Sequence, residues 1–478
     1  MTEQLNNLFE QWSEEKTVST TPLPQSGSSR QYFRMVSANH QAIGVYNPDT
    51  SENRAFITFT KHFLKHNLNV PNLYKSELDK NIYLIEDLGN ETLFSFITKN
   101  RTDEDFPNDI KEHYKTALAE LVKFQIDAFD GLDLSVCYPR SSFDKQSMLW
   151  DLHYFKYYFL KLTQTPFDEQ KLEDDFTTLI DFLLSTETEY YMYRDFQSRN
   201  IMLKKHKLYF IDYQGGRKGA LQYDVASLLY DAKADIPQHI RDELLEHYLL
   251  ILNQKIKINR KEFKKFYNGY VLIRILQAMG AYGFRGIHEK KAHFLKSIPY
   301  AVNNIEYLLS NNLLPQGLNE LNSAFNHILK NKSLRKFNTI EDSEKLTVLI
   351  NSFSFISGIP VDLSGNGGGF VFDCRSLDNP GRYDKFKMLT GKDKEVIEFL
   401  DKQSDAKQFL SDITSIIKRV INSYTERGFS HLVISFGCTG GQHRSVYCAE
   451  RLAEYLKNFI NTNVIIQHTE LEKKDMLQ

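Results

Sequence analysis

Cysteine is scarce in this chain of 478 residues, and its cysteines form no C-x-x-C pair; they are Cys137, Cys374, Cys438 and Cys448. This spacing excludes a dense disulfide framework and predicts free thiols in a reducing compartment. Long apolar runs are also missing. The longest uncharged, apolar-leaning run, residues 346–361, contains Asn351, Gly358 and Pro360. It is too short and polar to cross a bilayer, so we expect no membrane span.

An export signal and an excess of charge are absent as well. Residues 1–16 are polar and acidic, without the basic start and apolar core of a signal peptide, so we expect a cytoplasmic protein. The net charge is 59 − 61 = −2, and a nucleic-acid role would need a local basic patch. Hydrophobic residues make up 41% and charged residues 25%, which excludes a disordered or collagen-like chain.

Residue patterns divide the chain into four predicted parts. Residues 1–92 combine strand-like runs with one helix, and residues 93–310 are mainly helical with a β-rich insert at 191–216. Residues 311–345 predict a helical linker. Residues 346–478 alternate strand-like and helical runs, which is typical of an α/β domain.

The β-rich insert carries the first chemical signal. A loop with Asp195 and Asn200 precedes a hydrophobic strand that ends at Asp212. Phosphoryl transfer from ATP needs a carboxylate that orients the acceptor hydroxyl and takes its proton. It also needs oxygen ligands for Mg²⁺. The spacing predicts Asp195 as the base and Asn200 and Asp212 as metal ligands. Each residue alone is better explained as a turn former or strand end, but the three together favour a kinase-type site.

Three further segments resemble the aminoglycoside and choline phosphotransferases, small-molecule relatives of the protein kinases. Segment 83–89 resembles the hinge that bonds adenine through its backbone, which implies Glu86 and Leu88, and segment 223–229 resembles the helix whose aspartate braces the catalytic loop. Segment 26–34 resembles the phosphate-covering loop and the following strand; taken by itself it is also a polar turn. The resemblance implies cofactor-binding roles for Gly27, Ser28, Ser29 and Arg30.

The resemblance is closer still to the bacterial anomeric sugar kinases that act on N-acetylmuramate and N-acetylglucosamine (AmgK-like), and it covers about residues 1–310. It implies an α+β, protein-kinase-like module of two lobes, ATP and Mg²⁺ as cofactors, and a sugar or amino-sugar acceptor. An aromatic helix at 147–162 offers faces for a pyranose, although aromatics at helical spacing are more often core. The acceptor therefore rests on the resemblance.

Two departures from that family bear on the site. Tyr193 stands where many relatives have histidine, and residues 44–48 offer no lysine where most kinases place the phosphate-pairing one. The resemblance leaves Arg30 or Arg34 to supply the positive charge. If neither does, the lobe is a degenerate scaffold.

A second chemical signal follows a predicted apolar strand at 431–436. A glycine turn before a helix directs backbone N–H groups and the helix dipole at an anion. Gly440 and Gly441 allow close approach, and Arg444 adds a planar fork for phosphate oxygens. The predicted phosphate loop comprises Cys438, Thr439, Gly440, Gly441, Gln442, His443, Arg444 and Ser445. Two alternatives stay open: a C-x₅-R cysteine phosphatase, without an assignable acid, and a turn without ligand.

Residues 346–474 resemble the C-terminal domain of the RapZ family, bacterial regulators that sense amino-sugar phosphate and act as RNA-binding adaptors. The resemblance implies a separate α/β domain that binds a phosphorylated amino sugar. Asp373 and Arg375 either reach the same ligand or form an ion pair at a strand end. That family's N-terminal P-loop, G-x-x-x-x-G-K-[ST], is absent here. The matching stretches are 352–355 with 358–360, 372–375 with 379–380, 389–393, and 437–441 with 443–447.

Nucleic-acid binding carries over poorly, because residues 455–478 hold three lysines, Lys457, Lys473 and Lys474, against three acidic residues, Glu470, Glu472 and Asp475. RNA affinity is driven chiefly by phosphate neutralisation, so we expect weak binding at most. The leading hypothesis is an ATP-dependent sugar or amino-sugar kinase whose C-terminal domain binds an amino-sugar phosphate. The rival is a metabolite-sensing or RNA-adaptor protein with a degenerate kinase lobe.

Overall fold

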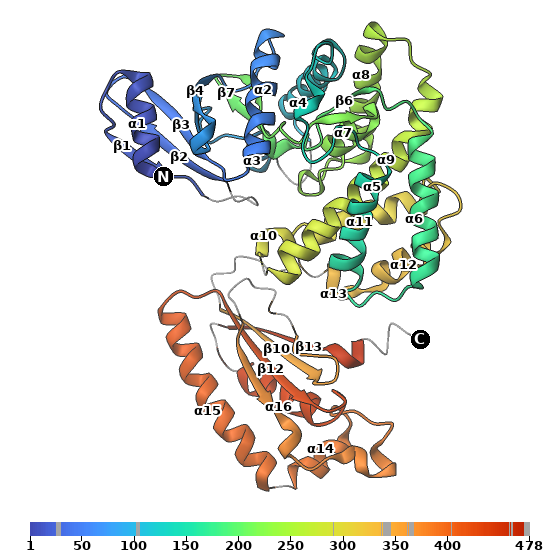
Figure 1. Cartoon of the computed structure of the whole chain (residues 1–478). Helices are drawn as coiled ribbons and strands as arrows, with labels where there is room; N and C mark the ends of the chain where they lie inside the picture. Colours follow the sequence, from blue (N-terminus) through green and yellow to red (C-terminus); the bar gives the residue numbers. More distant parts are fainter. Residues whose placement is uncertain are drawn as a thin grey trace. The chain divides into compact units, whose positions relative to one another are not determined.

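The computed structural model describes residues 1–24, 30–101, 106–289, 291–335, 337, 346–360, 362, 368–402, 404–457, 459 and 462–472. The chain divides into two compact units (Figure 1). The first unit comprises residues 1–156, 167–280 and 303–323, and the second comprises 157–166, 281–302 and 324–478.

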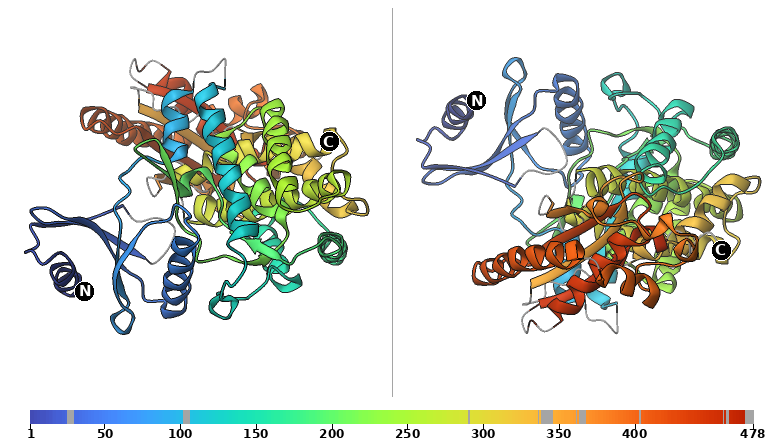
Figure 2. Two further views of the ribbon diagram at one scale, coloured as in Figure 1. Left: turned by 90° about the horizontal axis from the view of Figure 1, so that it is seen from above. Right: turned by 90° about the horizontal axis from the view of Figure 1, so that it is seen from below.

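An antiparallel sheet of five strands opens the first unit (Figures 1 and 2). Its strand order is β1-β2-β3-β5-β4. Helix α1 packs its apolar side, Leu5, Leu8 and Phe9, against this sheet. These three side chains are at most 1% exposed, so they anchor a segment whose overall composition is polar. The elements are α1 (Thr2–Ser13), β1 (Ser19–Pro22), β2 (Gln31–Val36), β3 (Gln41–Tyr46), β4 (Leu73–Glu77) and β5 (Ile82–Ile85).

Helix α2 (Thr50–Lys65) begins at Asp49, whose carboxylate caps the helix by accepting a hydrogen bond from the backbone of Glu52 at 3.0 Å. Its buried face stacks Phe56 against Tyr83 of the sheet and against Tyr213 of the next lobe. Thr60 Oγ1 lies 2.5 Å from the Tyr213 hydroxyl. Aromatic packing therefore holds α2 to both lobes.

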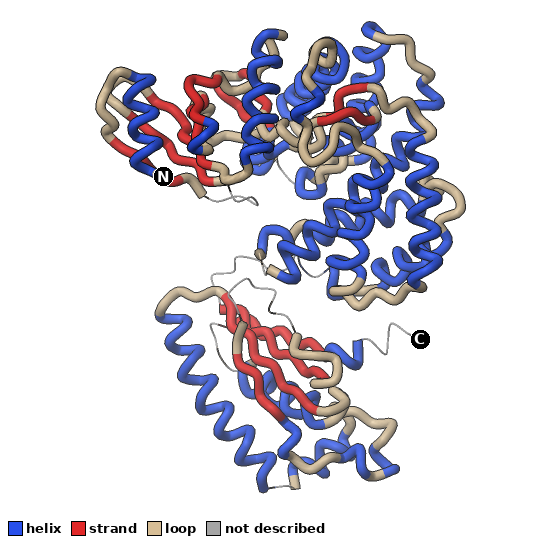
Figure 3. Tube along the Cα trace, viewed as in Figure 1, coloured by secondary structure: helices blue, strands red, loops and turns tan. Residues whose placement is uncertain are grey.

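Helices dominate the remainder of the first unit (Figure 3). Two small antiparallel sheets of two strands each interrupt them: β6 (Tyr190–Met192) pairs with β9 (Arg217–Gly219), and β7 (Ile201–Lys204) and β8 (Lys207–Phe210) form a hairpin. The helices wholly or largely in this unit are α3 (Leu93–Asn100), α4 (Asn108–Val122), α5 (Lys145–Phe155), α6 (Glu169–Leu184), α7 (Leu221–Leu229), α8 (Gln238–Lys255), α9 (Arg260–Ala281) and α11 (Ile298–Ser310). Helix α12 (Asn319–Lys330) begins in this unit and has its larger part in the second.

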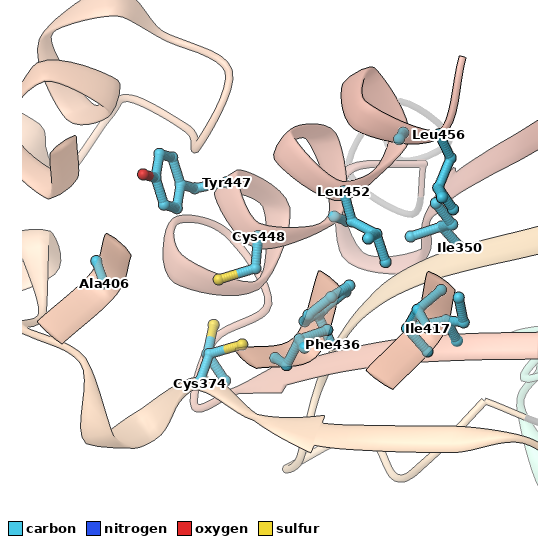
Figure 4. Close-up of a cluster of buried hydrophobic side chains, with 14 of the residues drawn as sticks. Ile350, Cys374, Ala406, Ile417, Phe436, Tyr447, Cys448, Leu452 and Leu456 are labelled. Atoms are coloured by element: carbon cyan, nitrogen blue, oxygen red, sulfur yellow. The ribbon is translucent and has the colours of Figure 1, made fainter. Parts of the chain in front are cut away.

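The second unit contains a parallel sheet of four strands in the order β11-β12-β10-β13. Phe436 on the sheet packs with Tyr447, Cys448 and Leu452 of α16 in one core (Figure 4). The strands are β10 (Leu346–Ser354), β11 (Phe370–Asp373), β12 (His431–Cys438) and β13 (Thr462–His468), and the helices include α10 (Ala292–Leu295), α13 (Lys332–Arg335), α14 (Lys394–Asp401), α15 (Ser404–Glu426) and α16 (Arg444–Leu456).

Register places the carboxyl ends of three strands together, since Ser354 lies opposite Cys438 and Asp373 lies opposite Gly437. In open α/β sheets, ligands bind beyond this edge. Among the helices that the structure describes, none is long and apolar enough to cross a membrane.

Candidate functional site

The three residues predicted to carry phosphoryl transfer come together between β6 and the end of β8. The side-chain amide of Asn200 donates to the backbone carbonyl of Asp195 at 2.9 Å and lies 3.3 Å from Asp212 Oδ2. Among described residues, the Asn200 side-chain oxygen accepts no hydrogen bond. The amide nitrogen therefore joins the two acidic segments, while the amide oxygen stays available to a cation.

The backbone at this site is strained and braced. Arg194 and Asp212 have φ of 83° and 68°, a left-handed conformation that costs a non-glycine residue about 1–2 kcal/mol. The buried carboxylate of Asp224 accepts hydrogen bonds from the amides of Tyr193 at 2.7 Å and Arg194 at 2.9 Å. Burial raises the pKa of Asp224 to about 7, against the effect of these hydrogen bonds. The bracing role implied for this aspartate fits the geometry.

Tyr193, at the position where many relatives have histidine, has a structural role in this chain. Its ring is 1% exposed, and its hydroxyl donates to the carbonyl of Ile211 at 2.7 Å. Ile211 immediately precedes Asp212, so the tyrosine fixes the backbone that presents the second carboxylate.

Arg30, not Arg34, is the cation at the predicted metal carboxylate. Its guanidinium pairs with Glu52 of α2 and lies 3.6 Å from Asp212 Oδ1. Arg34 instead pairs with Asp87 at 2.5 Å. Of the two arginines predicted to supply the positive charge, Arg30 is thus the one beside Asp212, with α2 supplying its partner carboxylate. Sequence reasoning missed Glu52, because nothing local marks a helix residue 22 positions away as the partner of Arg30.

Neighbouring groups act on the pKa of Asp212 in opposite directions. Burial and the neighbouring Asp195 carboxylate raise the pKa of Asp212, while Arg30 and the Gln214 amide, which donates at 2.7 Å, lower it. Carboxylate and amide oxygens are the donors that Mg²⁺ takes in proteins, usually one or two of them with waters and substrate phosphates completing the shell. Asp212 and Asn200 fit that description. Among described residues, no cluster of three or more His, Cys, Asp or Glu could hold a metal by itself.

Two residues of the catalytic loop also escaped sequence reasoning. Gln197 is 4% exposed and its amide lies 3.4 Å from Asp195 Oδ1. Arg199 donates to the Gln197 side-chain oxygen at 2.6 and 2.8 Å. This chain of polar contacts orients the candidate base.

The segments predicted to contact the nucleotide are only partly described. Gly27, Ser28 and Ser29 lie outside the described residues, as do Lys473, Lys474 and Asp475 of the charge count above. The Glu86 amide donates to the Asn72 carbonyl at 2.9 Å. Within the described part of the chain, the Glu86 carbonyl and the Leu88 amide have no backbone partner, as an adenine-binding hinge requires.

The aromatic helix divides its side chains between core and surface. Phe155 and Phe159 are fully buried, whereas Trp150 is 47% exposed. The packing expectation therefore holds for the two phenylalanines, while Trp150 lies at the surface with the Arg140 guanidinium over its ring, 6.0 Å from the centroid.

The predicted phosphate loop runs from the end of β12 into α16. Gly441 has φ +66°, and a Cβ there would lie 2.4 Å from Glu470 Cγ, so glycine is required. A Cβ at Gly440 would meet nothing within 4 Å. The amides of Gly440, Gly441 and Arg444 have no acceptor among described residues. This row of unpaired donors at a helix start is the arrangement that holds an anion.

Side chains of the loop brace it and do not point as a group at one ligand. Gln442 and His443 donate to carbonyls of the segment 386–389 at 2.6–3.0 Å. Arg444 is 5% exposed, and one of its terminal nitrogens donates to the carbonyls of Arg375 and Leu377. The guanidinium of Arg444, predicted to bind phosphate oxygens, is thus held by backbone carbonyls, and the unpaired amides are the donors that remain for an anion.

Two further predictions concern residues in or beside this loop: the role of Asp373 and Arg375, and the reactivity of Cys438. Asp373 and Arg375 form an ion pair at 2.6 Å at the end of β11, and the guanidinium covers the Phe355 ring at 4.3 Å. Cys438 is 3% exposed and belongs to the core that contains Cys374 and Cys448. Its sulfur lies 3.2 Å from Ser445 Oγ. A thiol packed in the core is poorly placed to attack phosphorus, which disfavours the cysteine phosphatase.

The first unit thus has two lobes and, between them, two carboxylates and an amide, the arrangement of a phosphotransferase of the protein-kinase type. Residues 19–258, half of the chain, match the model of the Phosphotransferase enzyme family. The chain belongs to that family. Residues 346–472 match the model described as the RapZ C-terminal domain, so a domain of this type follows the phosphotransferase module, and the expected fold class is confirmed.

Curated relatives match a minor part of the chain. A nucleotide-binding protein of Cupriavidus pinatubonensis is 44% identical over 131 residues, which is 27% of this chain and 42% of the relative. Nucleotide-binding protein YvcJ of Bacillus subtilis is 40% identical over 146 residues, 30% of this chain and 47% of the relative. The chain thus spans about half the length of the curated relatives it matches.

Solved structures resemble the N-terminal part. An ethanolamine kinase of Plasmodium vivax is 11% identical and covers 62% of this chain and 84% of its own, with a TM-score of 0.45. A choline kinase of Cryptosporidium parvum is 11% identical and covers 64% and 93%, with a TM-score of 0.44. Both scores are under 0.5, and the assignment rests on the family model.

Proposed function

We propose that the N-terminal module transfers the γ-phosphate of ATP to a hydroxyl of a sugar or amino sugar of the N-acetylmuramate or N-acetylglucosamine type. The observation that carries the proposal is the convergence of Asp195, Asn200 and Asp212, joined by one amide at 2.9 and 3.3 Å. Asp195 orients the acceptor and takes its proton. Asn200 and Asp212 hold Mg²⁺, which neutralises phosphate charge when bound.

Arg30 provides the positive charge beside the phosphates. Its pairing with Glu52 fixes the guanidinium next to Asp212, as an ion pair between a cation and a helix carboxylate does in kinases. The sugar acceptor is supported by the resemblance to anomeric sugar kinases, and the exposed Trp150 provides a ring on which a pyranose face can stack.

The C-terminal domain binds a phosphorylated amino sugar at the loop of residues 438–445. Unpaired amides at the start of α16 support this role. A purely regulatory protein with a degenerate kinase lobe is the second candidate, and the lack of a lysine in residues 44–48 favours it. The intact set of oxygen ligands and the replacement cation Arg30 speak for the enzyme.

An ADP-release assay of the full chain over a panel of sugars tests the proposal. Choline and an aminoglycoside are included as acceptors that the proposal does not expect. Asp195→Asn should lower turnover about 10²–10⁴-fold, the usual contribution of a general base. Asp235→Asn, at an exposed aspartate of the same module, should not. If none of the sugars is turned over, the acceptor assignment is wrong. If Asp195→Asn turns over as fast as wild type, the assignment of Asp195 as the base is wrong.

A further inference from the structure

The hairpin of β7 and β8 joins the two predicted metal ligands, since Asn200 directly precedes β7 and Asp212 follows shortly after β8. The same hairpin contacts the chain beside the predicted adenine hinge. The Leu203 amide in β7 donates to the carbonyl of Glu91 at 2.8 Å. One element therefore reaches both ends of the proposed nucleotide site.

Lys204, the last residue of β7, bonds the hinge through its side chain. Its ammonium group donates to the Glu86 carboxylate at 2.6 Å and to the backbone carbonyl of Asp87 at 2.9 Å. The Glu86 carboxylate also accepts from the side-chain amide of Asn72 at 2.7 Å, so it holds the lysine from a fixed position. Among the residues that the structure describes, Lys204 is the one donor to the Asp87 carbonyl.

The Asp87 carbonyl and the Leu88 amide belong to one peptide unit, which is planar and trans. In such a unit the C=O and the N–H point in opposite directions. A lysine that holds the carbonyl on one side therefore directs the Leu88 N–H to the other side. Leu88 is 6% exposed, and its amide has no acceptor in the described part of the chain. Buried amides are almost always paired, so this one is a donor that a ligand can satisfy.

We propose that Lys204 is a positioning residue for nucleotide binding. By holding the Asp87 carbonyl, it directs the Leu88 amide at a ring nitrogen of adenine, and it fixes this contact to the hairpin that joins the metal ligands. This inference rests on the proposed function of the module. It predicts that loss of the lysine weakens recognition of the base and leaves recognition of the phosphates unchanged.

Lys204→Met and Lys218→Met form a matched pair for the test. Lys218 also lies on a short strand of this module and pairs with Glu189 at 2.7 Å, and both lysine side chains are 30% exposed. Titration calorimetry of the full chain measures affinity for MgATP and for magnesium tripolyphosphate, which has the phosphates of ATP without the base. Lys204→Met should bind MgATP about three- to tenfold more weakly, the range of one hydrogen bond, and should bind tripolyphosphate as wild type does. Lys218→Met should match wild type with both.

Two results would overturn the inference. One is an MgATP affinity in Lys204→Met equal to that of Lys218→Met. The other is an equal loss of affinity for MgATP and tripolyphosphate, because the lysine would then act on the phosphate end of the site or on the fold as a whole. If Lys204→Met does not fold, the milder Lys204→Gln is measured with both probes and should show the same selective loss.

The failure of this inference can be told from failure of the proposed function. If Lys204→Met shows the selective loss but no sugar is turned over, the acceptor assignment is wrong and the role of Lys204 stands. If sugars are turned over and Lys204→Met binds MgATP as Lys218→Met does, the role of Lys204 is wrong and the kinase stands. A wild-type chain that binds no MgATP overturns both.

Discussion

Replacing Arg30 by alanine should damage the proposed reaction more than any change at Arg34. Arg30 is 4% exposed, pairs with Glu52 and lies 3.6 Å from Asp212 Oδ1. Loss of one preorganised group that stabilises transition-state charge typically lowers kcat about 10²–10³-fold, and we expect this range for Arg30→Ala. Arg30→Lys, which keeps the charge without the planar fork, should recover part of the loss.

The variant should also be less stable and have a shifted pH profile. Breaking a buried ion pair by removing one partner costs about 3–5 kcal/mol. We expect the lower end, about 3 kcal/mol, because the Glu52 side chain is 27% exposed and keeps its hydrogen bond from Asn47. Arg30 lowers the pKa of Asp212, so without it the carboxyl keeps its proton to higher pH. The acid limb of the pH–rate profile should then move upward.

The assay is ADP release at saturating and limiting MgATP, with urea unfolding for stability. Arg34→Ala is the matched control, since this arginine bonds Asp87, Gly89 and Asn90 at the hinge. Equal kinetics in Arg30→Ala and Arg34→Ala, or an acid limb that does not move, would refute the role given to Arg30.

Three more predictions follow from particular contacts. Tyr193→Phe leaves the partly buried Ile211 carbonyl without its donor, a loss of about 1 kcal/mol, and should raise the Mg²⁺ concentration needed for half-maximal rate; an unchanged Mg²⁺ dependence contradicts it. Gly441→Ala should abolish the thermal shift given by glucosamine-6-phosphate, because its Cβ would lie 2.4 Å from Glu470 Cγ; Gly440→Ala, with open space around it, is the folded control, and a retained shift in Gly441→Ala would count against the loop. Burial lowers the pKa of His468, so the unfolded chain takes up a proton first as pH falls below about 6.5. The C-terminal unit should lose stability from pH 7 to pH 5 in chemical unfolding, and His468→Gln should flatten this dependence.

Local spacing explains why the sequence predicted the centre of the site. Asp195 and Asn200 share one loop, and a short hairpin returns the chain to Asp212, so few residues need to fold for the three to meet. The strand and glycine turn before α16 were predictable for the same reason.

Contacts between segments far apart in the chain could not be predicted from the sequence. Glu52 as the partner of Arg30 depends on how α2 packs against the five-stranded sheet. Helix α1 looked like a polar terminus, because its apolar residues are few and only tertiary packing shows that they are buried. Strand β13 was missed as well, since its pairing partner β10 begins more than a hundred residues earlier.

The most direct test of the central claim is calorimetric titration of the full chain with ATP, with and without Mg²⁺, in wild type and Asp212→Asn. The account predicts that Mg²⁺ strengthens ATP binding in wild type, and that Asp212→Asn loses this gain while keeping its response to glucosamine-6-phosphate. ATP binding that is indifferent to Mg²⁺ in wild type, or a full Mg²⁺ effect in Asp212→Asn, would contradict the claim that these oxygen ligands hold a metal-bound nucleotide.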